Sequence, residues 1–314
     1  MKKKLLFFAP PHINIDEAIH HYIKQLDNYE VYFIQIKKYQ YKNFAERVQN
    51  FFSKLFLNKN LKAQKQKLMH YEFVKQQDNY DIFLAFRPDL LDETVLTEIE
   101  KRTPIRKAVY WDSFKKIPAL KDTIKYFNEL YSFEKEDCIN YNMKTSSNFY
   151  IEDKQIKNPE YDAFFFGAKD SRYENIKDLL LHLNKKGWNA KGLFAGKNDE
   201  TLLDGCVEVT TKRTPFLECN KFSNNTKVVL DIVHNNQNGL SMRPYEALGL
   251  NRKLITNNIH IKEYDFYLPE NIYIVEDFNN INIPDDFLET PYKEIPEAIK
   301  EKYYITNWLL NILK

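Results

Sequence analysis

Short apolar runs alternate with amphipathic segments along most of the chain. The runs are four to seven residues long and contain many β-branched and aromatic residues, which is typical of buried strands. In the first half they are Leu5–Ala9, Val31–Ile36, Tyr80–Phe86, Arg106–Trp111 and Glu129–Phe133. In the second half they are Asp162–Gly167, Asn189–Phe194, Val228–Val233, Lys253–Thr256 and Asn271–Val275.

The segments between these runs carry apolar residues at helical spacing. We expect helices over Asp16–Leu26, 43–73, Asp92–Arg102, Ala119–Asn128, Glu136–Asn142, Tyr173–Lys186 and, last, Ile295–Ile312. Strands that alternate with helices predict an α/β fold with mostly parallel sheets covered on both faces. The polar stretch 151–161, which contains Asn158-Pro159, is the best linker candidate. The prediction is two domains, 1–157 and 158–314, with a ligand site in the cleft between them.

Bulk composition excludes some classes of protein. The 314 residues carry 46 basic and 44 acidic side chains, a formal charge of +2, which argues against a nucleic-acid binder. Three widely spaced cysteines form no metal-ligand pattern and suggest a reducing compartment. The N-terminal apolar run is too short for a signal peptide, and no run approaches a membrane span. We therefore expect a cytoplasmic protein.

All seven glycines lie between Gly167 and Gly249. Glycine serves where the backbone turns with positive φ or approaches a ligand closely, so the second domain is expected to hold the ligand-binding loops. The stretch 238–257 fits best: after a buried strand come a loop with Gly239, a short helix with Arg243 and Glu246, and another strand. Exposed backbone N–H groups at such a loop and helix start favour an anion.

Local signals place this short helix. Ser241 is a candidate N-cap, Pro244 then falls in the first turn, and Asn251 lies where a left-handed C-cap is tolerated. Arg243 and Glu246 are three residues apart and share one helix face. They are either an exposed ion pair of little energetic value or two groups that hold one ligand, with the arginine on a diphosphate and the carboxylate on a ribose.

A second candidate anion contact lies at the start of this domain. Gly167 directly follows a buried strand, and Lys169 and Arg172 precede a helix. This order suits a turn that faces a phosphate, although a single glycine at a strand end is more often only a turn. The segment matches neither GxGxxG nor a Walker lysine loop.

The stretch from Gly239 to Gly249, together with Lys253-Leu-Ile-Thr-Asn257, resembles the donor-binding motif of GT-B glycosyltransferases, in particular the CgeB-like and capsular or lipopolysaccharide biosynthesis transferases of bacteria. Tyr110-Trp-Asp-Ser-Phe, Tyr131–Asp137 and Tyr264–Ile272 also fit that group. The resemblance implies two Rossmann-like domains facing a cleft, with the final helix able to pack back on the first domain. It also implies an activated sugar held by the second domain and an acceptor on the first.

By the family pattern, Glu246 would bind the donor ribose and Arg243 the phosphates, with Gly239 and Ser241 beside them and no essential metal. Many retaining members carry a second Glu eight positions earlier, where this chain has Asn238. The stereochemistry of transfer therefore stays open. No Asp-x-Asp is present, which argues against the metal-dependent GT-A class.

Two residues could act as the base that an inverting transfer needs. His12 and Asp112 both follow predicted strands of the first domain. Histidine suits a base near neutral pH, although a loop histidine is often only a surface residue. Asp112 could instead simply stabilise its own loop.

The segment 37–67 holds nine Lys or Arg and one acidic residue, Glu46, with apolar residues interleaved at helical spacing. A basic amphipathic helix is typical of peripheral contact with an anionic membrane on the inner face. The alternative, slightly favoured for the fold, is an ordinary helix with its apolar stripe packed on the sheet and its lysines in water, and both can hold at once.

These observations together predict a glycosyltransferase that moves a sugar from a nucleotide-sugar donor to a glycan or lipid-linked acceptor in cell-surface polysaccharide synthesis. The nucleotide sugar is a substrate, and no cofactor is expected. The alternatives are a GT-B-like nucleotide-sugar epimerase and a non-catalytic nucleotide-sugar-binding partner.

Overall fold

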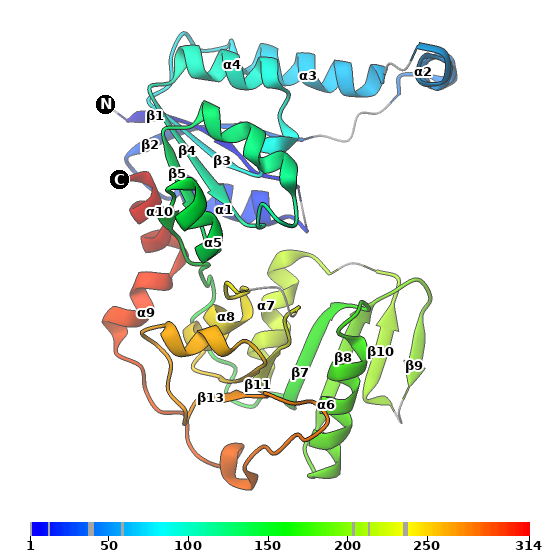
Figure 1. The fold of residues 1–314 in the computed structure, drawn as a ribbon, viewed down its shortest axis with the longest axis vertical. Helices are drawn as coiled ribbons and strands as arrows, with labels where there is room; N and C mark the ends of the chain where they lie inside the picture. The colour runs from blue at the N-terminus through cyan, green and yellow to red at the C-terminus, as the bar shows by residue number, and fades with distance from the viewer. Residues whose placement is uncertain are drawn as a thin grey trace. The chain divides into compact units, whose positions relative to one another are not determined.

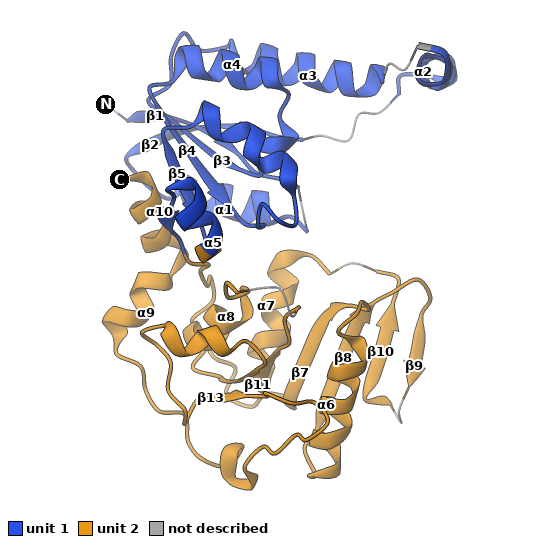
Figure 2. Ribbon diagram, viewed as in Figure 1, with its two compact units in different colours: residues 1–132, 136–146 blue, residues 133–135, 147–314 orange. Residues whose placement is uncertain are grey.

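The computed structural model describes residues 2–11, 13–36, 41–57, 60–202, 205–212, 214–234 and 238–314. They form two compact units (Figure 2). Unit 1 comprises residues 1–132 and 136–146, and unit 2 comprises residues 133–135 and 147–314. Within the described residues, no helix is long and apolar enough to cross a membrane.

Unit 1 is a parallel sheet with strand order β2-β1-β3-β4-β5-β6. Its strands are β1 (Lys3–Phe8), β2 (Tyr29–Ile34), β3 (Ile82–Phe86), β4 (Ile105–Tyr110), β5 (Glu129–Ser132) and β6 (Lys144–Thr145). Its helices are α1 (Ile15–Lys24), α2 (Phe44–Leu57), α3 (Leu61–Val74), α4 (Glu93–Arg102) and α5 (Lys135–Tyr141), with short 3₁₀ segments η1 (Pro88–Leu90) and η2 (Pro118–Tyr126). The predicted parallel sheet is confirmed.

Side-chain alternation explains why helices cover both faces of this sheet. Leu6 and Phe8 of β1 point into a core completed by α3 and α4. Phe7 points to the opposite face, where it contacts His20 of α1, with ring centroids 6.4 Å apart. Strands that are buried on both faces appear in the sequence as continuous apolar runs, and these runs allowed the strands to be predicted.

Unit 2 is a seven-stranded sheet with order β13-β12-β11-β7-β8-β10-β9 (Figure 1). Its strands are β7 (Tyr161–Ala168), β8 (Ala190–Ala195), β9 (Glu200–Leu202), β10 (Val207–Thr210), β11 (Thr226–Asp231), β12 (Lys253–Thr256) and β13 (Ile272–Ile274). Its helices are α6 (Tyr173–Lys185), α7 (Phe216–Asn224), α8 (Arg243–Gly249), α9 (Glu297–Tyr303) and α10 (Ile305–Leu313), with 3₁₀ segments η4 (Ile259–Glu263) and η5 (Asp285–Phe287). All pairs are parallel except β9 with β10.

Three predicted helices differ from the structure. The segment 43–73 is two helices, and the second begins after Asn60, whose side chain accepts from Ala63 N at 3.3 Å. The segment 119–128 is the 3₁₀ helix η2. The final helix is broken at Tyr304, because Tyr150 pairs with the backbone there: Tyr150 N donates to Tyr303 O and Ile305 N donates to Tyr150 O, both at 3.0 Å.

The segment predicted as a linker is irregular and is held by side chains of unit 2. Ile156 N donates to Asn224 Oδ1 at 2.8 Å, and Arg252 Nη2 donates to Ile156 O at 2.7 Å. The elements β6, β9, β10 and α7 were not predicted.

Gly249 allows α8 to lie directly against Tyr150. A Cβ at this position would lie 2.2 Å from Cδ2 of the tyrosine ring, which is only 3% exposed and cannot move aside. Although alanine favours a helix by about 1 kcal/mol, we expect Gly249→Ala to lower the free energy of unfolding by about 1–3 kcal/mol. Denaturant titration measures this. In a Tyr150→Ala background the same change should carry no cost, and an equal loss in both backgrounds would contradict the steric explanation.

Candidate functional site

The candidate site lies at the carboxyl ends of three neighbouring strands of unit 2. β7, β11 and β12 are adjacent and parallel, so their ends meet at one edge of the sheet. Ligands of open α/β sheets bind at this edge. Helix α8 begins twelve residues after β11 ends and brings Arg243 and Glu246 to it.

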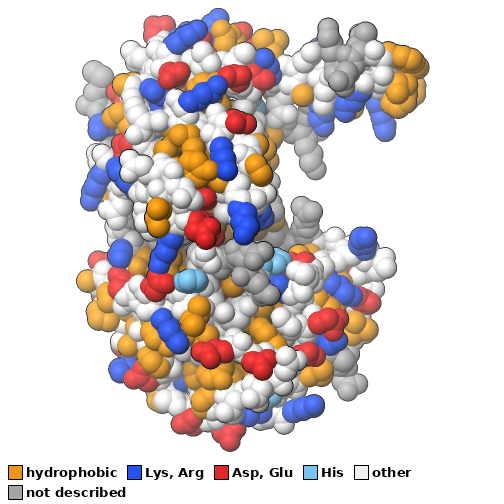
Figure 3. Space-filling view, viewed as in Figure 1, with side chains coloured by type: hydrophobic (Ala, Val, Ile, Leu, Met, Phe, Trp, Pro, Cys, Tyr) orange, Lys and Arg blue, Asp and Glu red, His pale blue; other side chains and the backbone are white. Residues whose placement is uncertain are grey.

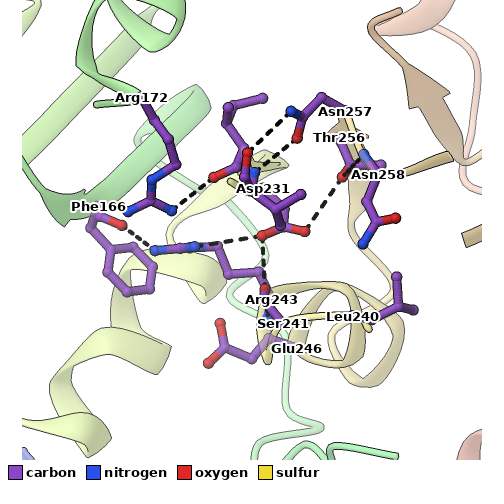
Figure 4. Close-up of polar contacts among 12 residues, drawn as sticks. Phe166, Arg172, Asp231, Leu240, Ser241, Arg243, Glu246, Thr256, Asn257 and Asn258 are labelled. Carbon is purple, nitrogen blue, oxygen red and sulfur yellow. Dashed lines mark hydrogen bonds and ion pairs between the residues drawn. The ribbon is translucent and has the colours of Figure 1, made fainter. Parts of the chain in front are cut away.

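Asp231, the last residue of β11, is the centre of the polar network (Figure 4). Its side chain is fully buried. Ser241 Oγ donates to Oδ1 at 2.7 Å, and Thr256 Oγ1 donates to Oδ2 at 3.4 Å. The Arg243 guanidinium lies 3.5 Å from Oδ1. A buried carboxylate needs such partners because burial removes its hydration.

Arg243, the first residue of α8, connects this network to β7. Its Nη2 donates to the carbonyl of Phe166, and its guanidinium lies 4.6 Å from the centroid of the Phe166 ring. The side chain is 15% exposed. Among the described residues, the buried Nε has no hydrogen-bond partner. The guanidinium is therefore fixed in place by Phe166 and Asp231.

The sequence predicted that Ser241 would be the N-cap of α8, and this prediction is wrong. The N-cap is Met242, whose side chain makes no capping bond. Ser241 Oγ accepts from Arg243 N at 3.2 Å while it donates to Asp231. The buried carboxylate thus fixes the hydroxyl ahead of the helix. Pro244 in the first turn and Asn251 with a φ of 47° are as predicted.

Glu246 is 3% exposed, so the alternative of an exposed Arg243–Glu246 ion pair is wrong. Ser223 Oγ of α7 donates to Glu246 Oε2 at 2.5 Å. Burial raises the pKa of this carboxyl, the Ser223 hydrogen bond and Arg243 partly offset the rise, and Asp231 adds to it.

Of the three candidate residues around the end of β7, Gly167 lies next to Arg243, whereas Lys169 and Arg172 bind other partners. Gly167 lies near the end of β7, where an added Cβ would come within 2.9 Å of Phe165 Cζ and 3.5 Å of Arg243 Nη2, so its closest neighbour is the Phe165 ring. Arg172 binds both oxygens of Asp170, at 2.9 and 2.7 Å, and donates to Ile232 O at 2.9 Å. Lys169 pairs with Glu200 of β9.

Gly239 lies close to another segment of the protein, residue Phe133, rather than facing an open ligand site. A Cβ there would lie 2.0 Å from Phe133 Cδ2 and 2.8 Å from Phe133 O. Asn258 Nδ2 donates to Gly239 O at 3.3 Å. The glycine thus lets the loop before α8 pack on residues 133–135.

The two candidate bases belong to unit 1. His12 lies outside the described residues. Asp112 follows β4 and accepts from Lys116 Nζ at 2.6 Å and from Arg87 Nη1 at 3.3 Å. Its catalytic role stays a prediction. No cluster of three or more His, Cys, Asp or Glu able to hold a metal ion occurs in the described parts of the chain.

Several residues of the site were not identified from the sequence. The signal for Asp231 is that it is the only polar residue in the apolar run 228–233. The signal for Thr256 is its hydroxyl at the end of the following predicted strand, Lys253–Thr256. Ser223 lies on a helix that was not predicted. His234 lies just beyond β11, with Nδ1 3.4 Å from Ser171 Oγ and Nε2 3.5 Å from Asp170 Oδ2.

No family model matches the chain, and no curated protein matches its sequence. Solved structures do match. An α-glucosyltransferase in complex with UDP has a TM-score of 0.54 at 8% identity and covers 98% of this chain and 95% of that one. A UDP-forming α,α-trehalose-phosphate synthase from Burkholderia xenovorans has a TM-score of 0.53 at 9% identity, covering 100% and 98%. A UDP-N-acetylglucosamine 2-epimerase has a TM-score of 0.51 at 9% identity, covering 96% and 94%.

The chain has the GT-B fold. The predicted pair of Rossmann-like α/β domains is confirmed at this level. At such low identity the likeness concerns the GT-B fold alone, and the function must be argued from the site.

The raised pKa of Glu246 predicts a pH-dependent stability. An acid with a raised folded-state pKa adds stability that is fully present below its unfolded value, here about 4.5, and is lost as the pH rises through the folded value. Glu246→Gln keeps the shape without the charge. We expect it to exceed the wild type in free energy of unfolding at neutral pH, with the difference vanishing at or below the unfolded value.

Denaturant titrations across this pH range measure the effect. Glu218→Gln, which removes an exposed carboxylate from α7, is the matched control and should show no such trend. A Glu246→Gln variant less stable than the wild type at neutral pH would contradict the prediction.

Proposed function

We propose that the chain is a glycosyltransferase that moves a sugar from a nucleotide-sugar donor to a glycan or lipid-linked acceptor, in the synthesis of a cell-surface polysaccharide in the cytoplasm. One observation carries the proposal: a buried carboxylate, Glu246, and a fixed guanidinium, Arg243, lie on one short helix at the carboxyl ends of β7, β11 and β12. GT-B structures that match the chain include a glucosyltransferase in complex with UDP.

Glu246 suits a ribose. A carboxylate offers about four acceptor sites, and Ser223 takes one on Oε2. The hydroxyls of a ribose would donate to the remaining sites and favour the charged form. A buried carboxylate with a raised pKa therefore gains more from such a diol than an exposed one would.

Arg243 suits the phosphates. Its terminal nitrogens are oriented by Phe166 O and Asp231, and each of them carries two N–H groups. A guanidinium already oriented by the protein loses little entropy on binding a phosphate oxygen. In this proposal Gly167 leaves room beside it, Ser241 holds the helix start, and Gly239, Lys169 and Arg172 shape the surrounding loops. No essential metal is proposed.

The GT-B epimerase in the comparison supports a second candidate, a nucleotide-sugar epimerase. It differs from the transferase in needing no acceptor. Incubation with a nucleotide sugar alone separates the two, because an epimerase changes the sugar while a transferase leaves it intact or slowly hydrolyses it. A protein that binds the donor and does neither, with or without a glycan acceptor, would be a non-catalytic binding partner.

The test of the ribose contact is a thermal-shift screen against nucleoside diphosphates and nucleotide sugars, followed by titration of the best ligand. Stabilisation follows RT ln(1 + [L]/Kd). We expect Glu246→Gln to weaken binding by about 10- to 100-fold, since a hydrogen bond to a charged group contributes about 1.5–3 kcal/mol. Glu218→Gln should bind like the wild type. If no nucleotide stabilises the wild type, the proposal is wrong.

The phosphate contact predicts a different pattern. Arg243→Lys keeps a positive charge but loses the planar fork. We expect it to weaken nucleoside diphosphate binding by about tenfold while leaving nucleoside binding unchanged. Isothermal titration with the matched nucleoside and diphosphate measures both. Equal losses for the two ligands would place Arg243 on the nucleoside rather than on the phosphates.

A further inference from the structure

Helix α2 (Phe44–Leu57) exposes its apolar side. Phe44, Phe51 and Leu55 are 77%, 62% and 63% exposed, and Phe52 and Phe56 beside them are 50% and 72% exposed. Phe44, Val48, Phe51 and Leu55 follow the i, i+4, i+7, i+11 spacing of one helix face, and Phe52 and Phe56 widen it on one side. The expectation that this stripe packs on the sheet is therefore wrong.

The opposite side of α2 is polar and buried. Asn50 and Ser53 are 3% and 6% exposed. Asn50 Oδ1 accepts from Lys62 N of α3 at 3.4 Å, and Glu46 pairs with Lys65 of the same helix. This reverses the usual arrangement, in which an amphipathic helix faces its protein with the apolar stripe. The polar contacts with α3 hold α2 so that its phenylalanines face outward.

Cations flank the exposed stripe. Arg47 and Lys54 lie along one side of it, one helical turn from Phe51 in each direction, and both are exposed. Neither makes an ion pair with another described residue. Figure 3 shows hydrophobic and basic side chains next to each other over this helix, at the upper right. An apolar face bordered by unpaired positive charge matches acyl chains bordered by anionic headgroups.

We propose that α2 is an interfacial helix that inserts its phenylalanine stripe into the surface of an anionic lipid bilayer. At 14 residues the helix is about 21 Å long and lies in the membrane plane. A second copy of the chain fits this face less well, because two-fold pairing would bring Arg47 and Lys54 against their own counterparts. A small apolar ligand would need a concave site, whereas one helix face is convex.

Vesicle co-sedimentation with the full-length chain, without nucleotide, tests the proposal. The probes are vesicles of phosphatidylcholine alone and of phosphatidylcholine with about a third phosphatidylglycerol. We expect the wild type to bind the anionic vesicles preferentially. The triple variant Phe44→Ser, Phe51→Ser, Leu55→Ser should lose at least about tenfold in partition coefficient.

A control variant replaces three other exposed apolar residues of the chain. Ile139, Leu217 and Ile259 are 81%, 54% and 52% exposed, and their triple serine variant should bind vesicles like the wild type. Arg47→Gln with Lys54→Gln should weaken binding by about fivefold per charge at low salt and little at high salt.

Insertion itself has a separate readout. Phe52→Trp should shift its fluorescence to shorter wavelength on adding anionic vesicles, and vesicle binding without that shift would overturn insertion. Equal binding of the wild type and the α2 triple variant, or equal binding to neutral and anionic vesicles, would also overturn the proposal. So would a wild-type dimer in light scattering that the triple variant abolishes with no vesicle binding, since a second copy would then cover the face.

The outcome is independent of the proposed function. The α2 triple variant should keep the stabilisation by nucleotide, and Glu246→Gln should keep vesicle binding. Loss of either property alone therefore identifies which of the two proposals has failed.

Discussion

The buried carboxylate of Asp231 is the constraint on which the candidate site depends. It lies at the end of a central strand with no exposed surface, so three other segments must supply its partners. Ser241 fixes the loop before α8, Thr256 fixes the end of β12, and Arg243 fixes the first turn of α8. Removing one partner of a buried charge typically costs about 3–5 kcal/mol. The same contacts that stabilise unit 2 therefore also orient the guanidinium.

A second buried carboxylate plays a different part. Glu246 has one hydroxyl partner, Ser223, and its pKa is raised by burial. Asp231 is surrounded by three donors and serves the fold, whereas Glu246 finds only Ser223 among the described side chains, fewer donors than a carboxylate can use. The two buried carboxylates, one at the end of β11 and one on α8, thus differ in role because their surroundings differ. Buried groups with a perturbed pKa are frequent at functional sites, which makes Glu246 rather than Asp231 the candidate for ligand contact.

The sequence predicted those parts of the structure that depend on local pattern. Apolar runs located the central strands, and Pro244 and Asn251 correctly bracketed α8, because helix ends follow from residues a few positions apart. Ser241 and Ser223 were misread or missed because their partners, Asp231 and Glu246, are 10 and 23 residues away. The stripe of α2 shows the same limit. Helical spacing identifies which face is apolar, but it does not say whether the protein covers that face or turns it outward.

The order of strands in unit 2 has a consequence for association between chains. The sheet ends on one side in β9, a three-residue strand that runs antiparallel to its neighbour, and on the other in β13, also of three residues. Open sheet edges carry unpaired N–H and C=O groups onto which a foreign strand can add. Each edge strand here has only three residues, so an added strand could form few backbone hydrogen bonds with it. The eight-residue strand β7 and the apolar strand β11 lie in the interior of the sheet, where both of their edges are paired.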